Sequence, residues 1–571
     1  PNTVNILSLE VEIRNNGGSG YSGFDNFKIE GTYNGLTFSN SSWNPSAPSA
    51  ATGSSDVLIM DGTYAVTSDV SLNDVTVNPN ANITVDAATT LTVNSLTLES
   101  TSSSYSSLIL DGSITGTVNY ERHVNGNTIL GDTNAIGNND LIAPPLSGQT
   151  FGAFASANSN LLENPGDANE KAFAPFDKAT GDYVNYFTTT NALTPLDAGV
   201  GYRAATDNTS TLTFTGTVNT GTVTNNIVNS GPAFAAWNLV GNPYPSYLKV
   251  QDFLNFEVAS GVKNLNLFEG TTAAIYGFDG DTGTNGNSYT IYNLVNTDAN
   301  TVIAPGQGFL VSADPAGVAT YDITFDPAMR ATGTNDDFIT GRGASTLINL
   351  ELQIGSASGT FVTDFYFNAN AGLGLDPGYD AAFFGSAPAF ALYSHLVEEN
   401  TGIPFTIQAL DTMDLDETTV ALGVNANQGE QLTFSISETT LPAAINVFLI
   451  DALTNTTTLL NSGDYVLTPA TNLNGTGRFY LNFKNSALNT TEENFSNINM
   501  YTLEKDLMIE GFLLDNTNVK IFDLQGRAII SLPLDTTSQI NTINMNPLAS
   551  GVYIVQLTNN TVVKSQKIVL K

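Results

Sequence analysis

Apolar and polar residues alternate in short runs along most of the chain. Thr, Val, Ile, Leu, Tyr and Phe form the runs, and Asn, Gly, Asp, Ser and Pro interrupt them. This period of two is typical of strands, whereas the 3.6-residue period of helices is almost absent. The pattern predicts an all-β chain with several β-sandwich or jelly-roll-like modules, a short β-solenoid segment and a C-terminal Ig-like domain.

The first 55 residues predict the end of one domain and a linker. Residues 1–33 carry only two strand patterns, and two strands are not stable alone in water. We therefore expect them to end a larger β domain that begins upstream. The stretch Phe24–Ile29 resembles the last strand of jelly-roll domains, many of which bind carbohydrate. Residues 34–55 are rich in Ser, Asn, Pro and Ala, which is typical of a linker.

Residues 56–120 carry very short strand patterns at close spacing. They are Val75–Val77, Ile83–Val85, Leu91–Val93, Leu96–Leu98 and Leu108–Leu110. Short strands separated by Asn, Asp and Ser predict a few coils of a β-solenoid. A stack of flat hairpins is the alternative interpretation of the same spacing.

Residues 121–340 predict a β-rich module in which apolar strands meet Gly/Pro turns. Its most distinctive stretches are Tyr120–His123, Trp237–Pro245 and Pro305–Val311. Residues 341–488 carry enough further strand patterns for a β-sandwich. Residues 489–505 are rich in Asn, Thr and Glu and predict a second linker.

Residues 506–571 alternate most regularly. Strands are predicted at Val519–Asp523, Ala528–Leu532, Thr542–Met545, Val552–Leu557 and Val562–Leu570, with a turn at Gln525-Gly526. Six or seven strands in this length predict a small sandwich.

Three motifs in this segment occur in a fixed order: Val519–Arg527, Leu548–Val555 and Lys567–Lys571. On these residues the segment resembles the type A C-terminal sorting domain of the type IX secretion system of Bacteroidetes. An ordinary Ig-like domain is the alternative. The basic last strand of an otherwise acidic chain favours the sorting domain. The resemblance assigns recognition to Asp523, Gly526, Arg527, Gly551, Val552, Tyr553, Ile554, Val555, Lys567, Ile568, Val569, Leu570 and Lys571.

The resemblance implies a route and a set of partners. Such cargo crosses the periplasm and an outer-membrane translocon, and its sorting domain binds a β-barrel shuttle protein of the PorV type. A surface sortase then usually removes the domain, which places the cleavage region at roughly residues 485–499 in this chain. The expected location is the cell surface or the medium. Parts of residues 121–488 also resemble surface proteins of the same bacteria, some of which act as adhesins in gliding motility.

Composition limits the partners further. The chain has 571 residues, no Cys, 54 Asp plus Glu and 18 Lys plus Arg, for a net charge of −36. A field of this sign repels phosphate backbones, so nucleic acid is excluded as a partner. The same field attracts cations, and calcium is the metal expected first. A glycan or another surface ligand stays open as a partner.

Few residues suggest catalysis. The chain has two histidines, His123 and His395, and both are expected to be surface or packing residues. Asp279, Asp281 and Asn285 lie in a Gly-rich stretch and form the best calcium candidate, although a plain Asx-rich turn explains them as well. We expect no catalytic residues and no cofactor other than calcium.

The sequence thus predicts a non-enzymatic, secreted structural or adhesive surface protein. The alternative is a secreted hydrolase or carbohydrate-binding protein whose catalytic domain lies upstream of residue 1.

Overall fold

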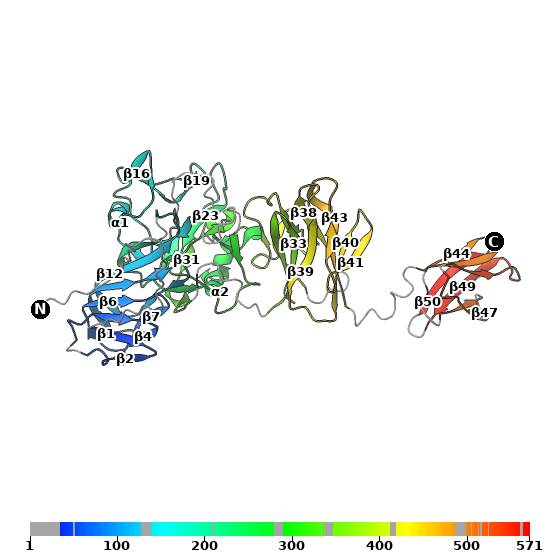
Figure 1. The fold of residues 1–571 in the computed structure, drawn as a ribbon, viewed down its shortest axis with the longest axis horizontal. Helices are drawn as coiled ribbons and strands as arrows, with labels where there is room; N and C mark the ends of the chain where they lie inside the picture. Colours follow the sequence, from blue (N-terminus) through cyan, green and yellow to red (C-terminus); the bar gives the residue numbers. More distant parts are fainter. Residues whose placement is uncertain are drawn as a thin grey trace, which may run out of the picture.

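The computed structural model describes residues 35–49, 52–126, 139–207, 210–278, 289–334, 336, 347–411, 418–485, 498–503, 505–511, 513, 517–523, 525–538, 540–559 and 563–570. A solenoid, a central unit, a large curled sheet and a C-terminal sandwich follow one another along the long axis (Figure 1). The predicted all-β class is confirmed. The predicted jelly-roll end at residues 1–33 lies outside the described residues. In the part of the chain that is described, no helix is long and apolar enough to cross a membrane.

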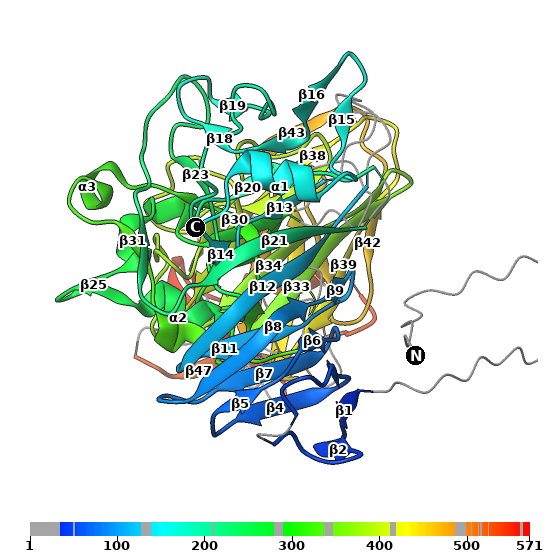
Figure 2. The ribbon, with the colours of Figure 1, turned by 90° about the vertical axis from the view of Figure 1, so that its left-hand side faces the viewer.

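The solenoid consists of parallel strands that stack coil upon coil, as predicted (Figure 2). One sheet contains β1 (Leu36–Ser39), β3 (Val57–Ile59), β5 (Val70–Ser71), β6 (Asp74–Val77), β8 (Thr90–Leu98) and β12 (Ser113–Val124). The facing sheet contains β4 (Gly62–Val66), β7 (Ala81–Val85) and β11 (Ser107–Leu110). Every second residue points inward, so buried side chains form columns such as Phe38, Ile59, Val77, Leu98 and Tyr120.

The solenoid begins earlier than the sequence indicates. Residues 36–44, predicted to be part of a linker, form β1 and β2 (Ser42–Asn44). Leu36 and Phe38 are buried because they extend the interior columns beyond β3. Trp43 in β2 packs its ring 4.8 Å from that of Tyr64. The surrounding Ser, Asn and Pro residues obscure these two short strands in the sequence.

The solenoid and the central unit share β12. This strand is parallel to β8 on one side and antiparallel to β21 (Ser210–Val218) on the other. The predicted boundary between residues 120 and 121 therefore falls inside a strand. One hydrophobic core extends from Leu36 to Val218 across it.

The central unit is built from small sheets around a second core. Its four-stranded sheet has the order β23 (Trp237–Gly241), β30 (Gly308–Ser312), β27 (Ile275–Phe278) and β28 (Tyr289–Tyr292). Its other elements are β9 (Ser100–Thr101), β10 (Ser104–Tyr105), β13 (Asp140–Ile142), β14 (Leu146–Ser147), α1 (Phe151–Ala157), β15 (Glu163–Asn164), β16 (Asp167–Lys171), β17 (Phe173–Ala174), β18 (Phe176–Asp177), β19 (Asp182–Tyr183), β20 (Tyr202–Ala204), β22 (Val223–Asn225), β24 (Tyr247–Lys249), α2 (Val250–Asn255), β25 (Glu257–Ala259), β26 (Val262–Lys263), β29 (Val302–Ile303), α3 (Pro315–Val318), β31 (Ile323–Phe325) and β32 (Arg330–Ala331).

The curled sheet occupies the segment predicted to be a β-sandwich. Its strands are β33 (Ile348–Ser356), β34 (Gly359–Phe367), β35 (Ala381–Ala382), β36 (Ala391–Ser394), β37 (Phe405–Leu410), β38 (Thr419–Ala426), β39 (Leu432–Thr439), β40 (Ile445–Asp451), β41 (Thr456–Leu459), β42 (Tyr465–Leu467) and β43 (Leu473–Asn485). All of them except β35, which pairs with β37, form one continuous hydrogen-bonded path that folds over, so that its halves pack face to face. The ring centres of Phe434 in β39 and Phe479 in β43 are 5.0 Å apart across this core.

The three distinctive stretches of the central segment meet at its junction with the solenoid. The buried Arg122 donates from Nη2 to Oε1 of Gln307. The backbone N–H of Asn242 donates to the carbonyl of Gln307 over 2.9 Å. The N–H of Leu108, in the solenoid, donates to the carbonyl of Pro245 over 2.6 Å. The motifs therefore hold the two units together.

The central unit and the curled sheet also share a core. Trp237 and Tyr276 pack in one cluster with Tyr366 and Ile407 of the curled sheet. Tyr276 Oη donates to the carbonyl of Ala382 over 2.7 Å. The described residues from β1 to β43 thus pack as one body.

Candidate recognition site in the C-terminal domain

The C-terminal domain is a sandwich of two small sheets. One contains β44 (Asn499–Leu503), β45 (Asp506–Glu510) and β48 (Ile540–Asn544). The other has the order β47 (Ala528–Pro533), β46 (Asn518–Phe522), β49 (Gly551–Thr558) and β50 (Val563–Leu570). The domain begins at β44, inside the segment predicted to be a linker, because Met500 alternates into the core. Residues 489–497 of that linker lie outside the described residues.

The terminal hairpin divides the predicted recognition residues between two faces. Tyr553, Val555, Ile568 and Leu570 point into the core and are buried. On the other face, Val552 lies opposite Val569, and Ile554 lies opposite Lys567. We call these four outward residues the outer face. Since a partner contacts exposed atoms, the outer face carries any direct recognition by this hairpin, and the buried residues hold it in shape.

The last strand, β50, lies at the edge of its sheet and is fastened to β44 by side chains. Lys564 Nζ donates to the carbonyl of Ile498 over 2.9 Å, and Gln566 Nε2 donates to that of Met500 over 2.8 Å. Thr502 Oγ1 donates to the carbonyl of Val569 over 3.1 Å. These bonds satisfy backbone acceptors that an edge would otherwise present to another chain. Lys571 lies outside the described residues.

The Asp523–Arg527 motif is a turn between β46 and β47. The Asp523 carboxylate accepts from the backbone N–H groups of Gln525 and Arg527 over 2.9 and 3.0 Å, and from Arg527 Nε over 2.8 Å. The N–H of Arg527 is the main reason that the pKa of Asp523 is lowered. Gly526 completes the turn with φ of +78°. These contacts give Asp523, Gly526 and Arg527 a structural role, which is to form the turn.

Replacing Gly526 by alanine is expected to destabilise this turn. A Cβ atom is disfavoured in the left-handed region, so we expect a loss of about 1–2 kcal/mol in the local free energy of opening. Hydrogen exchange of the β46 and β47 amides in the full chain measures this loss. Gly551→Ala is the matched control, because the nearest atoms to a Cβ there lie at 3.9 Å. An equal loss in both variants would contradict the turn's role.

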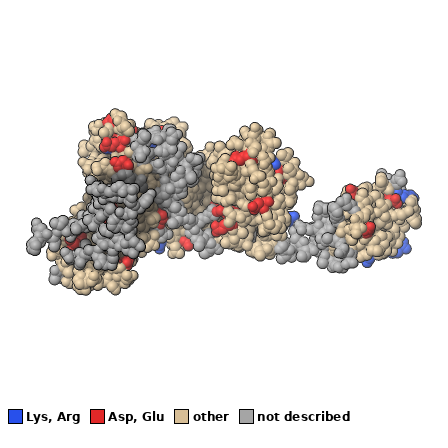
Figure 3. Space-filling model, in the orientation of Figure 1, with Lys and Arg blue, Asp and Glu red and all other residues tan. Residues whose placement is uncertain are grey.

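Charge separates this domain from the body. Residues 498–571 contain six Lys plus Arg and six Asp plus Glu, which leaves 12 and 48 in residues 1–497. The entire net charge of −36 therefore belongs to residues 1–497. On the face drawn in Figure 3, basic side chains gather on the C-terminal domain, and acidic ones are scattered over the body.

Family comparisons agree with this division. Residues 482–571 match the family described as the secretion system C-terminal sorting domain. Residues 30–483 match a family described as a domain of unknown function, DUF8693. The chain belongs to the DUF8693 family. With its sorting domain, it is a cargo protein of the type IX secretion system that is exported to the cell surface or secreted.

The DUF8693 body spans the solenoid, the central unit and the curled sheet. No curated protein matches the chain. One matching solved structure, titled as the BSP domain of a biofilm associated protein, is 13% identical over 25% of this chain. The match spans 27% of that structure, with a TM-score of 0.13. A likeness at this level supports no argument about fold or function.

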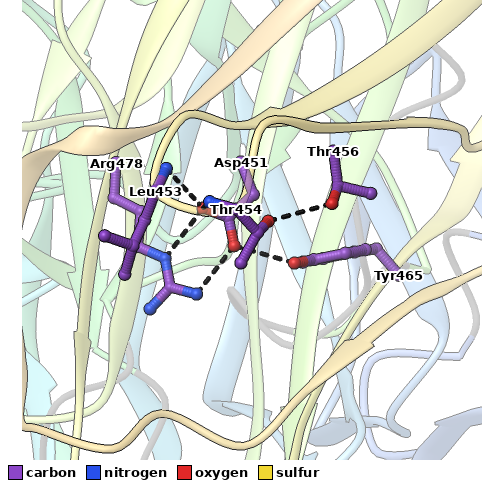
Figure 4. A network of polar contacts seen from close by, with 6 residues as sticks. All are labelled: Asp451, Leu453, Thr454, Thr456, Tyr465 and Arg478. Atoms are coloured by element: carbon purple, nitrogen blue, oxygen red, sulfur yellow. Dashed lines mark hydrogen bonds and ion pairs between the residues drawn. The ribbon is translucent and has the colours of Figure 1, made fainter.

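A network of polar contacts in the body lies at Asp451, at the end of β40 (Figure 4). Its buried carboxylate accepts from Arg478 Nε and Nη2 over 3.0 and 2.7 Å, and from Tyr465 Oη over 2.7 Å. The N–H groups of Leu453 and Thr454 also donate to it. Burial alone would raise the pKa of Asp451, but the bonds from Arg478 and Tyr465 hold it well below its usual range.

This network joins β40, β42 and β43, so its role is to stabilise the sheet. Nothing in the sequence indicated that Asp451 and Arg478 would form a pair.

The two histidines lie in packed surroundings. His123 is nearly buried in β12, where its N–H donates to Ser100 Oγ. His395 stacks on Tyr393, and burial lowers its pKa. The calcium candidates Asp279, Asp281 and Asn285 lie outside the described residues, so that site stays a prediction. Within the described residues, no three His, Asp or Glu side chains are grouped to hold a metal.

Proposed function

We propose that the DUF8693 body is a structural or adhesive module of the cell surface, in a role that includes gliding-associated attachment. The observation that supports this proposal most directly is the continuous packing from β1 to β43. Buried contacts such as Arg122–Gln307 and Tyr276–Ala382 span both junctions. Apolar and buried interfaces of this kind resist hinge motion between units. A stiff body suits a spacer or adhesin.

Attachment of cells tests this role. Deleting residues 30–483 while keeping the sorting domain is expected to reduce attachment to surfaces without affecting growth. A hydrolytic activity of the purified full chain, with attachment unchanged by the deletion, would overturn the proposal.

The outer face is the proposed contact for the β-barrel shuttle of the PorV type, before a surface sortase removes the domain. Its support is the alternation of apolar and basic side chains on an edge hairpin, a form that pairs with sheet edges or enters a barrel mouth. Val569 and Lys567 are exposed there although Ile568 and Leu570 of the same strand are buried. This exposed apolar residue has no evident role within the domain itself.

Export of altered cargo tests this contact. Deleting the last ten residues is expected to leave the cargo in the periplasm, but it also removes the buried Ile568 and Leu570 from the core. Val569→Glu avoids this problem, because Val569 is 49% exposed. Ile540→Glu is the matched control on the other sheet, at 47% exposed. Cell fractionation should show periplasmic retention of Val569→Glu alone; normal export of both Val569→Glu and the truncated cargo would refute the contact.

A further inference from the structure

A pocket of about 160 Å³ lies where the central unit meets the curled sheet. We call it the aromatic pocket. Its walls come from β28, β34, β37 and the loop after β35, and its lining residues are Tyr289, Ile291, Phe361, Phe383, Phe384, Ser386, Pro388 and Thr406. Ligand sites occur preferentially at such junctions between units. A cavity of roughly 150 Å³ can hold a six-membered ring, so this one accommodates a single ring-sized group.

The walls of the pocket are fixed in place. Phe384 packs against the central unit, with its ring 4.5 Å from that of Tyr289 and 4.7 Å from that of Trp237. Its neighbour Phe383 packs against the curled sheet, 5.8 Å from Phe361. Because the two adjacent rings are anchored in different units, the pocket is formed before any ligand arrives, which reduces the ordering cost of binding.

The lining combines aromatic rings with free hydroxyl groups. The side-chain hydroxyls of Tyr289, Ser386 and Thr406 make no hydrogen bond to another described residue. Among the described lining residues none is charged, and the body is strongly acidic. An anionic ligand would be repelled by this field, and a cation would find no carboxylate in the pocket.

We propose that the aromatic pocket binds one pyranose residue of a neutral glycan. A pyranose ring presents weakly positive C–H groups on its faces, which match the negative faces of aromatic rings, and hydroxyls around its edge, which match the three free hydroxyls. The biological role of this binding rests on the proposed adhesive function. The binding itself does not, because it can be measured with the purified chain.

Retention on immobilised polysaccharides tests the binding. The full chain is applied to neutral mannan, dextran and galactan and to anionic alginate. Titration with the retained sugar then follows Trp237 fluorescence in a Trp43→Phe background, since the chain has only these two tryptophans. We expect retention on at least one neutral polysaccharide and none on alginate. Retention on alginate alone, or on nothing, would overturn the proposal.

Variants locate the binding. Ser386→Phe places a bulky ring at an exposed lining position without adding a tryptophan, and it is expected to weaken binding by more than about tenfold. Ser462→Phe, at an exposed serine in the turn after β41, is the matched control and should bind as wild type. Thr406→Val and Tyr289→Phe each remove one hydroxyl and should weaken binding roughly 3- to 10-fold. Unchanged affinity in Ser386→Phe and in both hydroxyl variants would refute the site.

The two proposals fail separately. Binding in vitro with normal attachment of the body-deleted strain would refute the adhesive function alone. Lost attachment without polysaccharide binding would refute the pocket alone.

Discussion

Replacing Asp451 by alanine is expected to lower the free energy of unfolding of the curled sheet by about 3 kcal/mol. The side chain of Asp451 is fully buried, and that of its partner Arg478 is 20% exposed. Removing one member of a buried pair leaves the other charge without its counter-ion, which typically costs 3–5 kcal/mol. Urea denaturation of the full chain, followed through the transition of the curled sheet, measures the change.

An exposed ion pair provides the control. Lys249 and Asp252 are 3.8 Å apart with both side chains at least 40% exposed, so Asp252→Ala should change stability by less than about 0.5 kcal/mol. Similar losses in the two variants would show that the Asp451 network has no special role.

The same network predicts a pH dependence. The pKa of Asp451 is depressed in the folded state, so its contribution is fully present above the unfolded value of about 3.9 and is lost as the pH falls through the folded value. The stability difference between wild type and Asp451→Ala is therefore expected to be constant from pH 7 to 5 and to shrink at lower pH. A difference that grows on acidification would contradict this sign.

Replacing Gln307 by leucine is the second change for which we expect a large effect. The free energy of unfolding should fall by about 3 kcal/mol, because Gln307 lies at the junction of the solenoid and the central unit. Gln307 is 1% exposed and accepts from Arg122, and its Nε2 donates to the carbonyls of Leu141 and Gly308. Leucine has a similar size but removes these three hydrogen bonds from buried groups, and a lost buried hydrogen bond costs about 1–3 kcal/mol, or more at a charged group.

Chemical denaturation of the Gln307→Leu variant measures this loss of stability, and a substitution at a second glutamine provides the control. Gln251→Leu removes the donor to Thr297 at a half-buried site and should cost about 1 kcal/mol or less. A double-mutant cycle with Arg122→Met then isolates the Arg122–Gln307 coupling. A coupling near zero would mean that the junction depends on apolar packing alone.

The sequence predicted those features that depend on local alternation. Inward Val, Ile and Leu residues at every second position are sufficient to identify the solenoid strands and most strands of the C-terminal domain. Local alternation also has limits. Leu91–Val93 and Leu96–Leu98, predicted as separate strands, belong to the single strand β8, in which the exposed Asn94 lies at an irregularity in the pairing with β12.

Long-range contacts could not be predicted in this way. Arg122 and Gln307 are 185 residues apart, and nothing in either motif specifies the other. The aromatic pocket likewise combines Tyr289 with Phe384 from a different unit. In the C-terminal domain, the motif residues were recognised together, but only the fold separates the buried Tyr553 from the outward Val552.

The shared strand β12 has a consequence for how this family can vary in length. Val57, Val75, Leu96 and Val118 stack in one column, at intervals of 18, 21 and 22 residues. Each coil touches only its neighbours, so gain or loss of a whole coil before β8 leaves Arg122 and its junction unchanged. Members of the family are therefore expected to differ by multiples of ~20 residues in this segment. Such differences would change the length of the solenoid during evolution while the rest of the body stays the same.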